Sequence, residues 1–135
     1  MFGKNAKIEL LKGVPLFSDC SKRELADIAQ VADEMGFPAG RTLIEEGKPG
    51  REFFIIADGT VEVRRGGCKL PARGDANSFG ETSLLTGKPR NATVTTTSPV
   101  RVLVITDRAF QDLLRDVPSL APKLLANLAE RLDRG

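Results

Sequence analysis

Ten glycines recur between residues 36 and 87, and they limit the possible folds more than any other feature of this sequence. Short β-prone runs lie between or after them, at residues 53–56, 61–64, 92–95 and 100–105. Many short strands joined by glycine turns are typical of a β-sandwich or jelly roll. The interior of such a roll can hold one small ligand.

Local turn residues refine this expectation. Asp58-Gly59 predicts a hairpin turn between the runs at 53–56 and 61–64. Ser98-Pro99 predicts a turn before the last run. The segment 67–74 is short and contains Pro71, which cannot donate a ladder hydrogen bond, so we expect an edge strand there.

Helical patterns flank the glycine-rich segment on both sides. Residues 5–12 predict a short helix, and Ser21 with Glu24 forms a capping box for an amphipathic helix over 21–34. Asp107 and Ser119 can each cap a further helix, and Pro118 separates the two. The last helix carries a stripe of four leucines, which we expect to cover the sheet; a dimer seam is the alternative. The stripe consists of Leu120, Leu124, Leu128 and Leu132.

Composition excludes several classes of protein. The formal charge of +2 is too small for a nucleic-acid surface, and the absence of Trp and Tyr removes most base-stacking side chains. The absence of His excludes a Ser-His-Asp triad and the common zinc sites, so we expect neither an enzyme nor a metal protein. Cys20 and Cys68 have no metal-binding spacing, and we expect free thiols in a reducing cytoplasm. The chain has no apolar run of membrane-spanning length and no signal-peptide core at its start.

Residues 79–93 carry the chemistry that points to a ligand. Phe79 should end a strand, and Gly80 lets the backbone approach another group closely. Residues 81–86 should form a helical turn whose free N–H groups favour an anion. Glu81 can accept a hydrogen bond from a sugar hydroxyl, and the planar fork of Arg90 suits a phosphate. A plain ion pair between these two side chains is the alternative interpretation.

The wider pattern resembles the cyclic-nucleotide-binding domain of catabolite activator proteins, protein kinase A regulatory subunits and cyclic-nucleotide-gated channels. The residues that match its phosphate-binding cassette are Phe79, Gly80, Glu81, Leu84, Leu85, Arg90, Ala92, Thr93 and Val94. The resemblance implies an α+β fold in which an eight-stranded antiparallel β jelly roll (a double-stranded β-helix) lies between N-terminal and C-terminal helices. It implies one domain over 1–135, with helices in 1–34, the roll in 35–106, the cassette at 79–93 and helices in 107–135.

The resemblance also implies a role for each site residue. Glu81 would bind the ribose 2′-OH, and Arg90 would pair with the equatorial oxygen of the cyclic phosphate. Backbone N–H groups near Thr82 and Ser83, and that of Ala92, would complete the phosphate site. The inner wall beside the base or sugar would consist of Val61 and Val63, and a lid over the base would use Leu132 or Arg134.

Asn91 departs from the family's usual Ala, Ser or Thr at its position. Its amide can bond either adenine or guanine, so the choice of base stays open at this residue. The bacterial character of the sequence favours cAMP over cGMP.

The function implied is a cytoplasmic regulatory domain. It would bind a cyclic nucleotide and relay occupancy through its C-terminal helices to an effector outside this chain, with no direct nucleic-acid contact. The domain would be a monomer or a weak dimer through the last helix. The alternative is a vestigial jelly roll that only mediates protein–protein contacts.

Overall fold

A computed structural model of the chain describes residues 3–70, 78–81 and 86–133, with side chains as far as residue 130 in the last helix. The chain divides into two compact units. One is helical and combines Met1–Ala32 with Arg108–Gly135, and the other is the β unit, Asp33–Asp107.

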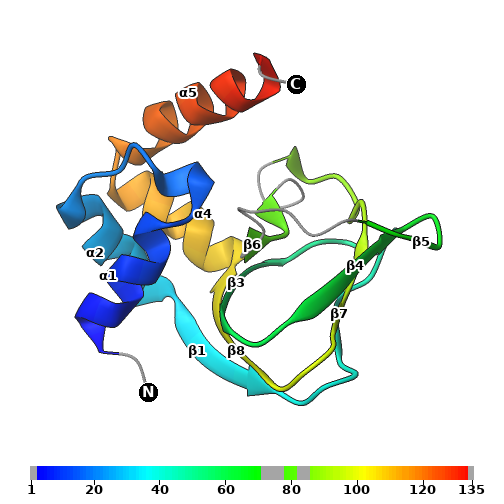
Figure 1. Cartoon of the computed structure of the whole chain (residues 1–135). Coiled ribbons are helices and arrows are strands. Elements are labelled where there is room, and N and C mark those ends of the chain that lie inside the picture. The colour runs from blue at the N-terminus through cyan, green and yellow to red at the C-terminus, as the bar shows by residue number, and fades with distance from the viewer. Residues whose placement is uncertain (1–2, 71–77, 82–85, 134–135) are drawn as a thin grey trace. The chain divides into compact units, whose positions relative to one another are not determined.

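The β unit consists of two four-stranded sheets in which every pair of neighbours is antiparallel (Figure 1). The strands of the first sheet are, in order, β1 (Asp33–Phe37), β8 (Val100–Thr106), β3 (Glu52–Asp58) and β6 (Ser78–Phe79). Those of the second are β2 (Thr42–Ile44), β7 (Thr93–Thr96), β4 (Val61–Arg65) and β5 (Cys68–Lys69). The predicted combination of antiparallel sheets with helices is confirmed. The predicted edge strand is β5; Pro71 lies outside the described residues.

The core of the β unit lies between the two sheets. It follows the two-residue period of the strands, since Phe54 and Ile56 of β3 join Val102 and Val104 of β8 there. The second sheet contributes Ile44 and Val94, and the partly buried residues packed against this core are Phe37, Leu43, Val61, Val63 and Phe79. The intervening residues of β3 and β8 are also buried, namely Phe53, Ile55, Leu103 and Ile105. The prediction of a fully buried strand at 53–56 is therefore confirmed.

The predicted hairpin at Asp58-Gly59 is wrong. The strands on either side of this turn, β3 and β4, belong to different sheets, so the turn passes from one sheet to the other. Gly59 has φ +99°, and a Cβ there would lie 2.4 Å from the Pro99 carbonyl oxygen. The two-residue turn signal was correct, but the close packing of this turn against the 97–99 turn sets the direction in which the chain leaves it.

The helical unit contains α1 (Lys4–Lys12), the 3₁₀ helix η1 (Pro15–Phe17), α2 (Lys22–Val31), α4 (Asp107–Asp116, shared at its first residue with the β unit) and α5 (Leu120–Asp133). The capping box of Ser21 and Glu24 is confirmed. The predicted extent of that helix to residue 34 is wrong. The chain is extended at Ala32, and Asp33 then enters β1 opposite Val104, so sheet pairing overrides the helical pattern.

The helix α5 packs against η1 within the helical unit. Asn127 is buried, and its Nδ2 donates to the Pro15 carbonyl at 3.0 Å and to Ser18 Oγ at 2.9 Å. Leu120 and Leu124 of the leucine stripe are buried as well, Leu128 is half-buried, and the side chain of Leu132 lies outside the described residues. The stripe therefore contributes to the core of the helical unit.

Cys20 and Cys68 are free thiols. Burial, reinforced by the negative charge of Glu24, raises the pKa of Cys20 to about 11, so this thiol stays protonated at neutral pH. Across the described ranges, no helix is both long enough and apolar enough to span a membrane.

Candidate phosphate site

Arg90 is the central side chain of the candidate site. Its backbone is fixed by the 45–48 turn, because its N–H donates to the Lys48 carbonyl at 2.9 Å and its carbonyl accepts from Gly47 N–H at 2.9 Å. Its side chain is only 6% exposed. Nη1 donates to the Gly80 carbonyl at 3.2 Å, and Nη2 donates to the Glu52 carbonyl at 2.6 Å. The β-prone run at 92–95 forms β7 (Thr93–Thr96), so Arg90 lies in the turn before this strand.

The electrostatic environment of Arg90 favours an anion. Burial lowers the pKa of the guanidinium, and the negative charge of Glu52 opposes that shift. An arginine remains protonated in a protein, so the positive charge is retained inside the β unit. Both side-chain hydrogen bonds end on neutral backbone carbonyls. A phosphate group would supply the negative charge that these carbonyls lack.

Gly80 brings the backbone against Arg90. It has φ +99°, and a Cβ built there would lie 2.5 Å from Arg90 Nη1 and 2.8 Å from the Glu52 carbonyl oxygen. A side chain at this position would displace the guanidinium. The close approach that the sequence predicted at Gly80 therefore exists, and its partner in the structure is Arg90.

Glu81 follows directly and is half-buried, with its Oε2 atom shielded from solvent. Glu81 and Thr86 both have helical backbone geometry, as expected at the two ends of the predicted 81–86 turn. The residues between them, including Thr82, Ser83, Leu84 and Leu85, lie outside the described residues. Their predicted contacts with a phosphate therefore stay predictions.

The other predicted site residues occupy distinct positions. Phe79 ends β6 opposite Phe54, as expected, and packs against the core between the sheets with Val61 and Val63. Ala92 is buried and Asn91 is exposed. The proposed lid residues are not tested, because Arg134 and the side chain of Leu132 lie outside the described residues. The structure thus brings Phe79, Gly80, Glu81 and Arg90 to one end of β6.

Sequence reasoning missed Glu52, Lys48 and Arg65. Glu52 and Lys48 accept hydrogen bonds from Arg90 through their backbone carbonyls, which leave no signal in the sequence, and the negative charge of the Glu52 carboxylate also acts on the guanidinium. Arg65 donates through Nε to the carbonyl of Asn91 at 2.9 Å. The sequence feature that could have indicated a role for Arg65 is its position at the end of β4, next to a Gly-Gly turn.

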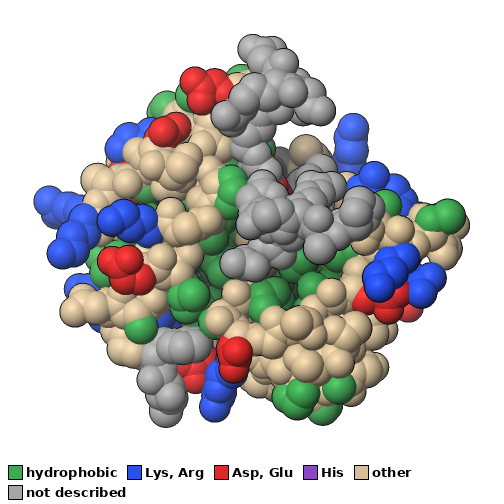
Figure 2. Space-filling model, viewed as in Figure 1, with side chains coloured by type: hydrophobic (Ala, Val, Ile, Leu, Met, Phe, Trp, Pro, Cys, Tyr) green, Lys and Arg blue, Asp and Glu red, His purple; other side chains and the backbone are tan. Residues whose placement is uncertain are grey.

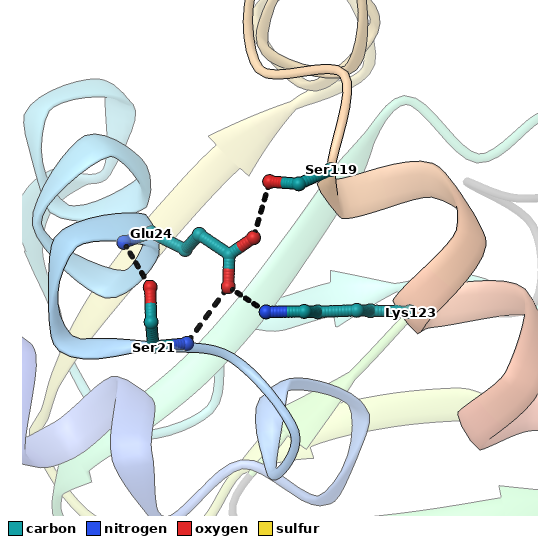
Figure 3. A network of polar contacts seen from close by, with 4 residues as sticks. All are labelled: Ser21, Glu24, Ser119 and Lys123. Carbon is teal, nitrogen blue, oxygen red and sulfur yellow. Dashed lines mark hydrogen bonds and ion pairs between the residues drawn. The ribbon is translucent and has the colours of Figure 1, made fainter.

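A second cluster of buried charge lies in the helical unit (Figure 3). Glu24 is 5% exposed, and its carboxylate accepts from Ser21 N–H at 2.8 Å, from Lys123 Nζ at 2.6 Å and from Ser119 Oγ. Burial raises the pKa of this carboxyl, but the hydrogen bonds from Lys123, Ser119 and Ser21 outweigh burial and lower the pKa to about 2. An open cleft of about 440 Å³ lies beside the network. Because protein donors satisfy the carboxylate, this cluster is structural.

On the face shown in Figure 2, basic and acidic side chains are interspersed. Among the residues that the structure describes, no group of three or more His, Cys, Asp or Glu could hold a metal ion.

Residues 34–117 match the family model described as "Cyclic nucleotide-binding domain". The chain belongs to this family. The match includes both sheets apart from Asp33, together with the described part of the candidate site, and it confirms the resemblance that residues 79–94 indicated.

Curated relatives from two kinds of regulator support the assignment. The chain is 39% identical over 114 residues to the cAMP-dependent protein kinase regulatory subunit of Aspergillus fumigatus, covering 82% of this chain and 27% of that protein. It is 30% identical over 131 residues to the CRP-like cAMP-activated global transcriptional regulator of Mycobacterium tuberculosis, covering 93% of this chain and 58% of that protein. The chain thus spans less than two thirds of the length of either relative.

Solved structures agree on the fold. The N-terminal domain of a transcriptional regulator from Streptomyces coelicolor A3(2) superimposes with a TM-score of 0.81 at 29% identity and 93% coverage of both chains. A structure described as cAMP bound PfPKA-R superimposes with a TM-score of 0.72 at 25% identity, covering 93% of this chain and 47% of that one.

Proposed function

We propose that this domain binds a cyclic nucleotide at Arg90 and Glu81, and that it prefers cAMP to cGMP. The observation that carries the proposal is the buried guanidinium of Arg90, whose side-chain hydrogen bonds end on two neutral carbonyls. A singly charged cyclic phosphate matches this single buried positive charge. The preference for cAMP is supported by the two curated relatives, both of which carry cAMP in their names.

Each part of the nucleotide has a proposed partner. Arg90 pairs with the equatorial phosphate oxygen, and Glu81 accepts the ribose 2′-OH. The N–H groups of Ala92 and of the backbone near Thr82 and Ser83 donate to the remaining phosphate oxygens. The sugar and base lie beside Phe79, Gly80, Val61 and Val63. Asn91 is exposed, and its amide has the chemistry to bond either adenine or guanine.

The proposed output is regulatory and not catalytic. Residues 1–135 act as one cytoplasmic domain, a jelly roll with flanking helices, as a monomer or a weak dimer. Ligand binding shifts the C-terminal helices, with Leu132 or Arg134 closing over the base, and a coupling of about 1–3 kcal/mol to an adjoining effector is typical of such a transition.

A thermal-shift titration of the purified chain tests the proposal. We expect cAMP to raise the melting temperature more than cGMP at equal concentration, and a ligand at 100 times its dissociation constant adds about 2.7 kcal/mol. Adenosine, which has the base and sugar without the phosphate, is the matched control and should add little. If neither cyclic nucleotide raises the melting temperature, the roll is a structural domain and the proposal is wrong.

A second titration tests the role of Glu81. Wild-type protein should bind cAMP more tightly than 2′-deoxy-cAMP, and Glu81→Ala should bind the two equally, because it lacks the acceptor for the 2′-OH. A wild-type protein that already ignores the 2′-OH would remove Glu81 from the site and leave the role of Arg90 standing.

A further inference from the structure

The backbone of residues 90–93 is held in place from two other segments of the β unit. The 45–48 turn holds both the N–H and the carbonyl of Arg90. The backbone N–H of Glu46, in the same turn, donates to Thr93 Oγ1 at 3.0 Å. The second segment is the end of β4, where Arg65 donates to the Asn91 carbonyl.

These two segments are also joined to each other. Gly66 N–H, next to Arg65, donates to the Glu46 carboxylate at 3.0 Å. The contacts therefore form a closed ring that runs from β4 to residues 90–93, on to the 45–48 turn and back to β4. Within this ring, Arg65 is the one side chain shown to hold the peptide that joins Asn91 to Ala92.

That peptide has a special position in the proposed site. It contains the Asn91 carbonyl that Arg65 contacts and the Ala92 N–H that would donate to the phosphate. A trans peptide is planar, and its C=O and N–H point in opposite directions, so fixing one fixes the other. A cationic donor on the carbonyl also polarises the peptide and strengthens its N–H as a donor.

We propose that Arg65 is a positioning residue for the phosphate site, and that it acts through the Asn91 carbonyl to orient and polarise the Ala92 N–H. The inference rests on the proposed function, since it assigns Ala92 N–H to the bound phosphate. Arg65 itself need not contact the ligand. Its role is to keep the Arg90 side of the site in its binding geometry before the nucleotide arrives.

The chain offers a closely matched control in Arg64. This residue is next to Arg65 on β4, is also exposed and has the same charge. Its contacts are different, because it pairs with Glu62 Oε1 at 2.6 Å and donates to the Gly67 carbonyl at 3.1 Å. Arg64→Ala and Arg65→Ala thus remove the same charge from the same strand, and only the second removes the contact with Asn91.

Calorimetric titration with cAMP compares these variants. We expect Arg65→Ala to weaken binding about tenfold and Arg64→Ala to change it less than about twofold, with similar melting temperatures for both ligand-free variants. Arg65→Lys, which keeps a cationic donor, should recover part of the loss. Equal affinities for the two alanine variants would overturn the proposal. So would a loss of cAMP affinity in Arg65→Ala that is matched, in free energy, by a loss of folding stability in the same variant.

A ligand-free measurement separates this inference from the proposed function. In the amide NMR spectrum, Arg65→Ala should shift the Ala92 proton upfield and accelerate exchange of the Gly47 and Arg90 amides, and Arg64→Ala should leave all three unchanged. If wild type binds no cyclic nucleotide, the proposed function fails and these amides alone decide whether Arg65 positions the peptide. If wild type binds but neither the Ala92 amide nor the affinity responds to Arg65→Ala, the inference about Arg65 fails and the proposed function stands.

Discussion

Arg90 in the β unit and Glu24 in the helical unit are both almost fully buried charges, with exposed fractions of 6% and 5%. Their surroundings are opposite. Glu24 accepts from a lysine, a serine hydroxyl and a backbone N–H, whereas Arg90 donates to two neutral carbonyls. The difference separates a charge that links two helices from a charge that, under the proposed function, binds a ligand.

The physical basis of this difference is desolvation. A buried charge costs free energy unless an opposite charge and further hydrogen bonds offset the loss of water. Glu24 has those partners within the protein, so removing it should lower the free energy of unfolding substantially. Arg90 has hydrogen bonds, but they go to neutral carbonyls and not to an opposite charge. Removing Arg90 should therefore affect ligand binding far more than folding.

Glu24→Ala should give the largest effect on stability. The change removes both the capping box of α2 and the link to Ser119 and Lys123, so we expect a loss of about 3 kcal/mol in the free energy of unfolding, measured by urea denaturation. Glu9→Ala, at an exposed position of α1, is the control and should change stability by less than about 0.5 kcal/mol. Equal effects in the two variants would show that the buried network contributes nothing.

Acid should reproduce part of that loss. The pKa of Glu24 is lowered from 4.5 to about 2, so its contribution to stability is complete above pH 4.5 and disappears as the pH falls toward 2. We expect up to about 3 kcal/mol to be lost over this range through this carboxyl. The measurement is urea denaturation between pH 2 and 6, and Glu24→Gln should flatten the curve in this window. An unchanged slope in that variant would contradict the assigned pKa.

Comparing Gly80→Ala with Gly87→Ala separates the effect of contact with Arg90 from the effect of backbone strain alone. Both Gly80 and Gly87 have positive φ, but an added Cβ meets Arg90 only at Gly80 and meets nothing within 4 Å at Gly87. We expect Gly80→Ala to cost about 1 kcal/mol more stability than Gly87→Ala, and to weaken cAMP binding about tenfold. Urea denaturation and calorimetric titration with cAMP of the two variants check these expectations. Identical stabilities and affinities would mean that Gly80 does not position Arg90.

Arg90→Met should have the smallest effect on folding. The change removes a buried charge whose hydrogen-bond partners are neutral, so we expect the free energy of unfolding to stay unchanged or to rise by up to about 1 kcal/mol. Arg101→Met, which breaks the pair between the exposed Arg101 guanidinium and the largely buried Glu34 carboxylate, is the arginine control in the same unit. A loss of 2 kcal/mol or more, on the scale of buried ion pairs, would place Arg90 in the same structural class as Glu24.

The sequence predicted the parts of the molecule that depend on local chemistry. The capping box, the buried strand, the free cysteines and the end of a strand at Phe79 all follow from side-chain type and period, and all are present. The family that the motif indicated is confirmed, and the binding roles that it implies for Glu81 and Arg90 stay predictions.

The remaining features depend on contacts between distant segments. The turn at Asp58-Gly59 joins two sheets because it packs on the 97–99 turn, and α2 ends at Val31 because Asp33 pairs with β8. The Glu24 network needed Lys123, which lies 99 residues away. The partners of Arg90 were invisible in the sequence, since they are backbone carbonyls.

Calorimetric titration of wild type and Arg90→Met with cAMP tests the central claim most directly. The account predicts that wild type binds and that the variant, although folded, binds at least about 100-fold more weakly, because a charge-assisted contact with the phosphate is lost. Equal affinities in the two proteins would show that the buried guanidinium is not the phosphate-binding group, and would contradict the account.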